Sequence, residues 1–268
     1  MIKAKDLSDW NSFESQLQGL KAKYPRSTLL FRGQSDSQWS LATTLERAGR
    51  TGISFDEYYH LTAARIRPAV ETFTGARWDV PEPDPQLEKS FLDRELFQFH
   101  RFPSPNFYRY MVYLRHHGFP SPLLDWTHSP YVAAFFAFRE PTTALSRSIY
   151  VYCETPGIGK GGAVGETSMR SIGPYVRSHP RHFRQQSNYT ICAEYREKTG
   201  WHFHPHEPIF GGRGEQDFAW KFNLPSTERL SVLRLLNDYN LNAFSLFDSE
   251  ESLLETMWFR EYVLKIPG

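Results

Sequence analysis

The sequence predicts an α+β fold in which a helical N-terminal half packs on a mixed, mainly antiparallel sheet. Helical spacings of apolar residues dominate the first half of the 268 residues, whereas apolar runs typical of strands appear mainly in the second half. The regular alternation of strands and helices that marks a doubly wound sheet is not found. Aromatic residues make up 16% of the chain, so extended disorder is not expected.

In the first half, each element follows from a local pattern. Trp10, Phe13 and Leu17 recur at helical spacing, and Ser54 with Glu57 forms a capping box that predicts a helix start. The apolar run that follows Ser129 and Pro130 is hydrophobic all round, which predicts a buried helix. The elements expected are helices at 9–23, 55–70, 87–102, 105–117 and 131–138, a strand at 29–31, an extended stretch at 118–127 and a loop at 77–86, the best candidate for a mobile segment.

The second half is expected to hold most of the strands. The glycine-rich stretch 157–165 is predicted to be a loop. The elements expected are strands at 148–153, 189–195, 218–224 and 242–247, a helix at 226–239 and a last helix from 248. We expect one domain over 1–268, with an N-terminal helix in 1–27, a motif-bearing core in 28–247 and a C-terminal helix in 248–268.

Charge and composition narrow the function classes. The net charge is +1, with 31 basic and 30 acidic residues, which argues against a surface wholly devoted to nucleic acid. Cys153 and Cys192 lie in apolar runs and are expected to be buried thiols in a reducing compartment. No signal peptide and no membrane span are recognised, so no membrane partner and a cytoplasmic location are expected.

The tripeptide Phe31-Arg32-Gly33 at the end of an apolar run is the first candidate site. A buried guanidinium needs an anionic partner, either a phosphate of a ligand or a carboxylate of the protein. Gly33 would let the backbone turn sharply and a ligand approach, and Gln34 adds an amide beside the guanidinium. Both interpretations of Arg32, ligand binding and a structural ion pair, stay open.

The second candidate site is the segment from His116 to Pro130. Asp125, Thr127 and Ser129 place a carboxylate and two hydroxyls at a turn from a strand to a helix, where functional sites are often built. The alternative is a structural corner, in which these groups cap the helix and Trp126 packs. Pairing of Asp125 with Arg32 would join the two motifs.

Three further motifs are weaker. The segment 180–190 offers polar donors before a strand, or is a solvated loop. The stretch 157–162 matches G-x-G-x-x-G, but no helix begins at it. His202, His204 and His206 alternate, but Pro205 interrupts their geometry, and no metal site is expected.

Together, these motifs resemble the FRG domain family over residues 28–247. This chain departs from the family pattern at residue 122, which is Pro where an Arg is usual, and Arg115 is the candidate to replace that second cation. The motifs are Leu30-Phe31-Arg32-Gly33-Gln34, His116-x-Gly118-x-Pro120, Leu123-Leu124-Asp125-Trp126-Thr127-x-Ser129-Pro130, Ala133-Ala134-Phe135-Phe136-Ala137, Gln185-x-Ser187-x-Tyr189-Thr190, Asn223-Leu224-Pro225 and Ser245-Leu246-Phe247.

The family occurs in bacterial, phage-conflict and toxin-like proteins. More distantly, the order of motifs resembles ADP-ribosyltransferases of the Arg-first type, which implies a split sheet and NAD as the substrate. By this resemblance the protein cleaves NAD and transfers ADP-ribose to a nucleic acid or a protein, plausibly in bacterial toxin action or anti-phage defence. The resemblance implies that Asp125 and Gln185 are catalytic, with Glu194 and Glu215 as alternative carboxylates, and that the ligand contacts Arg32, Gly33, Gln34, Trp126, Thr127, Ser129 and Tyr189. His116 is a third catalytic candidate.

Two other functions remain open on the same residues. The cleft would equally serve a non-catalytic module that binds a nucleotide or a nucleic acid. His116 and Asp125 could also act as the acid and base of a hydrolase.

Overall fold

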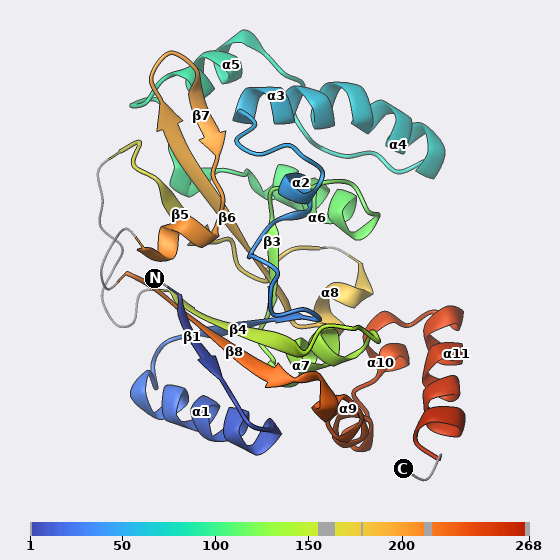
Figure 1. Ribbon diagram of the computed structural model, residues 1–268. Coiled ribbons are helices and arrows are strands. Elements are labelled where there is room, and N and C mark those ends of the chain that lie inside the picture. The colour runs from blue at the N-terminus through green and yellow to red at the C-terminus, as the bar shows by residue number, and fades with distance from the viewer. Residues whose placement is uncertain (1, 155–163, 178, 212–215, 266–268) are drawn as a thin grey trace.

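The computed structural model shows an α+β protein whose strands form one mixed sheet (Figure 1). The structure describes residues 2–154, 164–177, 179–211 and 216–265. In this part of the chain the strand order is β1-β8-β4-β2-β3-β6-β5, with β7 paired to β6. The strands are β1 (Lys3–Asp6), β2 (Leu29–Gln34), β3 (Leu124–Thr127), β4 (Ser146–Glu154), β5 (Ser168–Ser171), β6 (Ser187–Arg196), β7 (Gly200–Phe203) and β8 (Asp217–Pro225).

Only β1 and β8 pair in parallel among these strands, which confirms the predicted fold class. The sheet nearly divides between β2 and β3, where a single residue pair, Phe31 with Thr127, joins the two strands. By contrast, β2 pairs with β4 over its whole length. Two half-sheets therefore meet at the β2–β3 junction, and they diverge from it in Figure 1.

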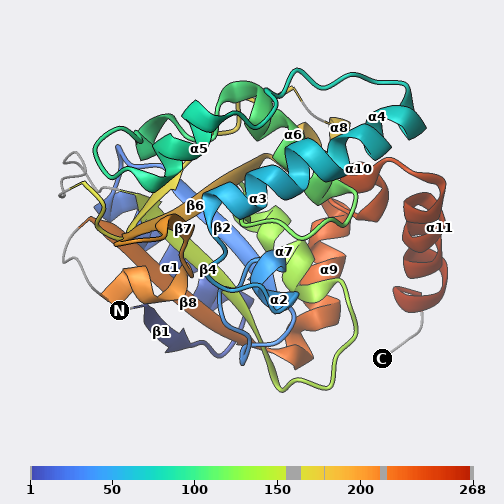
Figure 2. The ribbon, with the colours of Figure 1, turned by 90° about the horizontal axis from the view of Figure 1, so that it is seen from above.

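Helices cover both half-sheets (Figures 1 and 2). The α-helices are α1 (Trp10–Lys23), α2 (Thr44–Arg47), α3 (Phe55–Tyr59), α4 (Arg67–Thr74), α5 (Pro85–Leu92), α6 (Pro105–His116), α7 (Pro130–Phe138), α8 (Pro180–Arg184), α9 (Arg229–Asp238), α10 (Ala243–Phe247) and α11 (Glu250–Trp258). A π-helical segment, His60–Ile66, joins α3 to α4, and a second, Phe259–Val263, follows α11; short 3-10 turns lie at Phe99–Arg101, Glu207–Gly211 and Ser226–Glu228.

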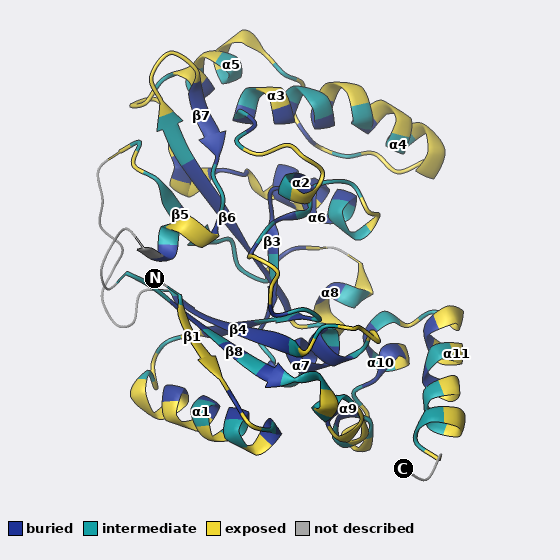
Figure 3. Cartoon of the chain, viewed as in Figure 1, coloured by how far each residue is buried: buried dark blue, intermediate teal, exposed yellow. Residues whose placement is uncertain are grey.

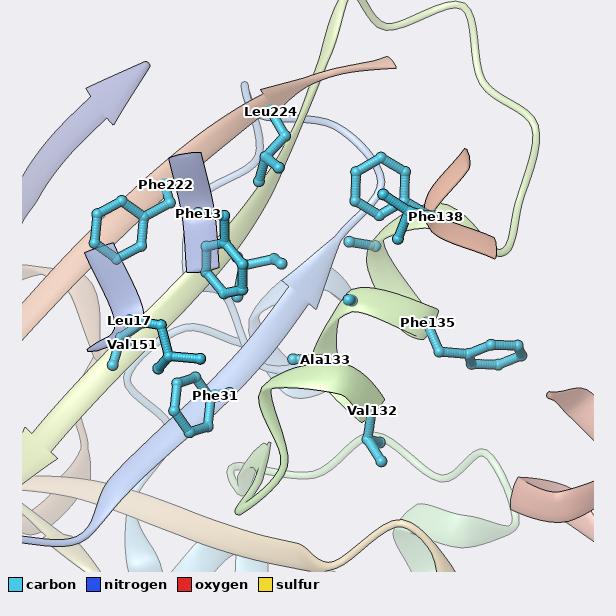
Figure 4. Close-up of a cluster of buried hydrophobic side chains, with 14 of the residues drawn as sticks. Phe13, Leu17, Phe31, Val132, Ala133, Phe135, Phe138, Val151, Phe222 and Leu224 are labelled. Atoms are coloured by element: carbon cyan, nitrogen blue, oxygen red, sulfur yellow. The ribbon is translucent and has the colours of Figure 1, made fainter. Parts of the chain in front are cut away.

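The predicted buried helix is α7, and it packs directly on β2. Seven of its nine residues are buried. Its side chains join those of α1, β2, β4 and β8 in one apolar cluster, shown in Figure 4 with Phe13, Phe31 and Phe138. A second cluster lies between the helices α3, α5 and α6 and the strands β6 and β7. Figure 3 shows the central strand β4 buried, whereas the edge strand β1 and the outer side of α1 are exposed.

Several local predictions are wrong in informative ways. The predicted strand 242–247 is the helix α10, because Asn242 caps it: its side chain accepts from Ser245 N, and the Ser245 side chain accepts from Asn242 N. The predicted helix 87–102 begins earlier, at Pro85 after the cap Asp84, and ends at Leu92. Asp93 ends it because its carboxylate accepts from two amides of the following turn.

The short elements β1, β5, β7, α2 and α8 were not predicted, since four or five residues carry too little periodicity. Both cysteines are buried, as expected. No helix of the described residues combines the length and the apolar character needed to cross a membrane. The single domain over 1–268 stays a prediction, and the 157–162 motif lies outside the described residues.

Candidate functional site

The β2–β3 junction holds a cluster of three charged side chains. Arg32 on β2 donates through Nη1 to the backbone oxygen of Asp125 (2.8 Å) and to its Oδ1, so the predicted pairing of the two motifs is confirmed. Arg115, at the end of α6, donates through Nη2 to the same Oδ1 (2.5 Å) and through Nη1 to Thr44 Oγ1 (3.0 Å). Arg115 thus provides the second cationic contact to Asp125, which Pro122 cannot make.

Electrostatics keep this cluster ionised. Burial raises the pKa of the Asp125 carboxyl, but the Arg115 and Arg32 guanidiniums outweigh this effect and hold the pKa well below its ordinary value. Both arginine side chains are only 11% exposed, whereas that of Asp125 is 44% exposed. Asp125 is therefore a permanent anion near neutral pH and is unsuited to proton transfer there.

A cavity of about 390 Å³ opens at this junction, and all the predicted site residues except Ser129 line it. Four arginines surround it, Arg32, Arg47, Arg115 and Arg181, and in the described residues Asp125 is the only carboxylate in its lining. Four positive charges against one negative charge leave three uncompensated. Such an excess favours an anionic ligand.

The residues of the tripeptide have three different roles. Phe31 is 2% exposed and belongs to the α7 cluster, while Arg32 contacts Asp125. Gly33 does not turn the chain as expected, because β2 continues through Gln34. Instead it lets α7 approach: a Cβ at Gly33 would lie 2.6 Å from Ala137 N and closer still to Ala133 O. The glycine is required by helix–strand packing.

Three polar side chains of the prediction are tied to the cavity wall. Gln34 is 4% exposed and donates through Nε2 to Ser40 O (3.0 Å). Thr127 Oγ1 donates to Gln185 O (2.7 Å), and Gln185 Nε2 donates to Leu246 O (3.3 Å). Gln185 ends α8, so the segment 180–190 is a short helix followed by β6 and not a solvated loop.

Trp126 and Tyr189, which were predicted to contact the ligand, have rings that pack in the protein interior. The Trp126 indole is 3% exposed, donates to Thr190 Oγ1 (2.9 Å) and packs on Tyr152. Tyr189 is 1% exposed and stacks on His182 with 5.9 Å between ring centroids. Both rings are part of the core, because alternate residues of a strand face opposite sides of a sheet and these sides are covered.

Ser129 has the structural role of a helix cap. Its Oγ accepts from Val132 N (3.3 Å) at the start of α7, its own amide donates to Thr127 Oγ1 (3.1 Å), and it does not line the cavity. The predicted ligand contact at Ser129 is therefore replaced by a capping role.

We expect Ser129→Ala to lower the free energy of unfolding by about 1 kcal/mol, because one amide of α7 loses its acceptor. Urea unfolding measures this change. Ser129→Asp, which restores a capping oxygen, is the control and is expected to unfold near the wild-type midpoint. An unchanged midpoint in Ser129→Ala would show that the cap contributes nothing.

His116 is a neutral side chain near pH 7. Burial lowers its pKa to about 4, and the charges of His182 and Arg115 act in the same direction. Its Nε2 lies 3.2 Å from the Tyr189 hydroxyl. Within the described residues no hydrogen bond joins His116 to Asp125, and the hydrolase hypothesis stays a prediction.

The alternative motifs within the described residues do not line the cavity. Glu194 pairs with Arg196, and Glu215 lies outside the described residues. His202 bonds to Gly52 O (2.8 Å) and to Thr199. In the part of the chain that is described, the one candidate metal-ligand group is Asp56, His60 and Glu88, away from the cavity lining. The prediction of no metal site therefore stays a prediction.

Sequence reasoning missed Arg47 and Thr44 in the cavity wall. Both lie on α2, whose capping box pairs Thr43 with Glu46. That T-x-x-E pattern is visible in the sequence and would have predicted the helix. Nothing in the sequence indicates that this helix would contact Arg115 of α6 and Ser121.

The fold and the site define an α+β protein with a cationic cavity where two half-sheets meet. Residues 27–145 match the model of the FRG domain family, which confirms the predicted resemblance over this segment. This segment includes Arg32, Arg47, Arg115 and Asp125, whereas Arg181 and Gln185 lie beyond it. A search of curated proteins gave no match, and neither did a search of solved structures.

Proposed function

We propose that this cavity binds a nucleotide through its phosphates, with NAD as the first candidate, and that the protein is an ADP-ribosyltransferase-like enzyme. The supporting observation is the charge excess, four arginines against one carboxylate in a cavity of about 390 Å³. A pyrophosphate carries two negative charges, and guanidinium groups bind phosphate oxygens in a bidentate manner. The volume is within the range of small-molecule sites.

Arg32 retains donors for such a ligand. Asp125 occupies only its Nη1, and the other guanidinium nitrogens make no hydrogen bond within the described residues. Gln185 donates from Nε2 to Leu246 O, which leaves its Oε1 to accept from a ribose hydroxyl. Phe136 and Phe247 add apolar surface to the same wall.

In the proposed reaction the bond between nicotinamide and ribose breaks, and its electron pair leaves with nicotinamide. A nucleophile of a nucleic acid or a protein then attacks the ribose carbon and loses a proton. Asp125 is the only carboxylate of the described lining, and two guanidiniums share its charge. Its role in this scheme is to hold Arg32 and Arg115 in position, with limited stabilisation of the oxocarbenium-like state.

The pairing of Asp125 with two arginines favours a second candidate, a non-catalytic nucleotide-binding module. A carboxylate paired with two arginines exerts only a weak field on a developing cation. The module would use the same arginines for binding and leave NAD intact.

Isothermal titration calorimetry with NAD, ADP-ribose and adenosine tests the binding. NAD and ADP-ribose are expected to bind and adenosine to bind at least tenfold more weakly, since it has no phosphate. Arg181→Gln is expected to weaken ADP-ribose binding about tenfold, because a charge-assisted hydrogen bond is lost. Arg184→Gln is the matched control, because Arg184 lies on the same helix but pairs with Asp248 outside the cavity.

Incubation with labelled NAD and cell extract then separates the two candidates. Nicotinamide release with label on a macromolecule supports the transferase. Binding without release supports the module. Failure of NAD and ADP-ribose to bind at millimolar concentration contradicts both.

A further inference from the structure

We propose that Gln34, Trp39 and Arg47 form a distinct subsite at the mouth of the cavity, which recognises a nucleobase together with the neighbouring phosphate. This mouth subsite rests on the proposed nucleotide-binding function and specifies the ligand class. Arg32 and Arg115 are separate from this subsite, because they share their charge with Asp125.

Arg47 is the cation of the lining that is most available to a ligand. Its guanidinium makes no hydrogen bond and no ion pair to any described residue. The neighbouring carboxylate of Glu46 accepts from Thr43 N (2.7 Å) as part of the capping box and makes no ion pair with Arg47 among the described residues. Burial lowers the pKa of Arg47, and repulsion from Arg32 and Arg115 lowers it further. An anion between these three groups would relieve that repulsion.

Trp39 offers an aromatic face beside this cation. Its side chain is 52% exposed although it lines the cavity. Its backbone is held, because the carbonyl accepts from the Tyr150 hydroxyl (3.1 Å) and the amide donates to Asp36 O (3.3 Å). A large apolar ring left exposed on a fixed backbone at a cavity is typical of a stacking platform for a base.

Gln34 supplies a third observation that points to a ligand. The side chain is 4% exposed and lines the cavity. Its Nε2 donates to Ser40 O, which ties it to the segment carrying Trp39, while its Oε1 is buried without a hydrogen-bond partner among the described residues. Buried acceptors are rarely left unpaired, and a hydroxyl or amino group of a bound nucleotide would satisfy this one.

Binding of ADP and of ribose 5-phosphate to the full chain, measured by calorimetry, tests the mouth subsite. Trp39→Ala is expected to weaken ADP binding about tenfold and to leave ribose 5-phosphate binding unchanged, because only ADP has a base to stack. Trp39→Phe is expected to retain most of the ADP affinity. Arg47→Gln is expected to weaken both ligands about tenfold.

Two substitutions outside the cavity are the controls. Arg50→Gln removes the same charge three residues further on, and Trp258→Ala removes another exposed indole. Both variants are expected to bind ADP and ribose 5-phosphate as tightly as the wild type does. If Trp39→Ala and Arg47→Gln also bind ADP as tightly as the wild type, the mouth subsite is wrong while nucleotide binding stands. If the wild type binds neither ligand nor ADP-ribose, the proposed function itself is wrong.

Discussion

Replacing Gly33 with alanine is expected to lower the free energy of unfolding by about 3 kcal/mol or more, or to prevent folding. The added methyl group would meet the backbone of α7, 2.6 Å from Ala137 N and 3.0 Å from Ala133 C. Ordinary carbon contacts lie at about 3.5–4.0 Å. Backbone atoms cannot rotate away as a side chain does, so the whole helix must shift.

Such a shift is costly because α7 is enclosed. Ala133, Ala134, Ala137 and Phe138 are fully buried, and the helix packs on β2 and β4 in the largest cluster of the half-sheet that carries Arg32. Overpacking of a close-packed core typically costs about 1–3 kcal/mol, and a clash with backbone is at the upper end or beyond it. Urea unfolding followed by circular dichroism measures the change.

Gly19 provides the matched control. It lies on the exposed side of α1, and a Cβ there meets nothing within 4 Å. Gly19→Ala is expected to raise the free energy of unfolding by about 1 kcal/mol, because alanine favours the helix. Alanine would thus lower the free energy of unfolding at position 33 and raise it at position 19. A wild-type midpoint in Gly33→Ala would contradict the close approach of α7.

The second large decrease in the free energy of unfolding is expected for Asp125→Asn. The substitution keeps the shape of the side chain but leaves the Arg32 and Arg115 guanidiniums, each 11% exposed, without their shared anion. Breaking a buried pair costs about 3–5 kcal/mol. Because the Asp125 side chain is 44% exposed, solvent screens its interaction with the two arginines. We therefore expect Asp125→Asn to lower the free energy of unfolding by about 2 kcal/mol at pH 7.

The pH dependence of this loss has a defined sign. The folded-state pKa of Asp125 is lowered, whereas an unfolded aspartate has a pKa of about 3.9. The carboxylate therefore contributes its full stability above about pH 5 and loses it as the pH falls below 4. The difference in unfolding free energy between the wild type and Asp125→Asn should shrink between pH 5 and pH 3.

Urea unfolding of both proteins at pH 7, 5 and 3 measures this convergence. Asp238→Asn is the control, because Asp238 is exposed at the end of α9. We expect a change of less than about 0.5 kcal/mol for it at pH 7. A difference between wild type and Asp125→Asn that stays constant across this pH range would show that the two arginines do not depress the carboxyl pKa.

Elements with a strong local signal could be predicted from the sequence. The helix α1 has its apolar residues on one side, and α7 is apolar throughout behind a Ser-Pro start, so both patterns are contained in a few turns of chain. The segment 242–247, predicted as a strand, is the helix α10. The Asn242 cap and the packing of α10 against α11 determine its conformation.

The candidate site was predictable in part. An arginine after an apolar run and an aspartate at a strand end left open a pairing of the two, and they do pair. The orientation of Trp126 and Tyr189 was not predictable, because it depends on which layer covers each side of the junction. Arg47 was missed, because a four-residue helix has no pattern that shows which surface it contacts.

The sequence by itself determined the fold class, the buried helix after Pro130 and the charged groups available to a site, because these follow from residue type and from spacing over one or two turns. Only the tertiary structure decided that β2 and β3 meet through one residue pair and that arginines from four segments surround one carboxylate. It also decided that Gly33 serves helix packing. These facts depend on contacts between residues about 100 positions apart, and local patterns do not encode such contacts.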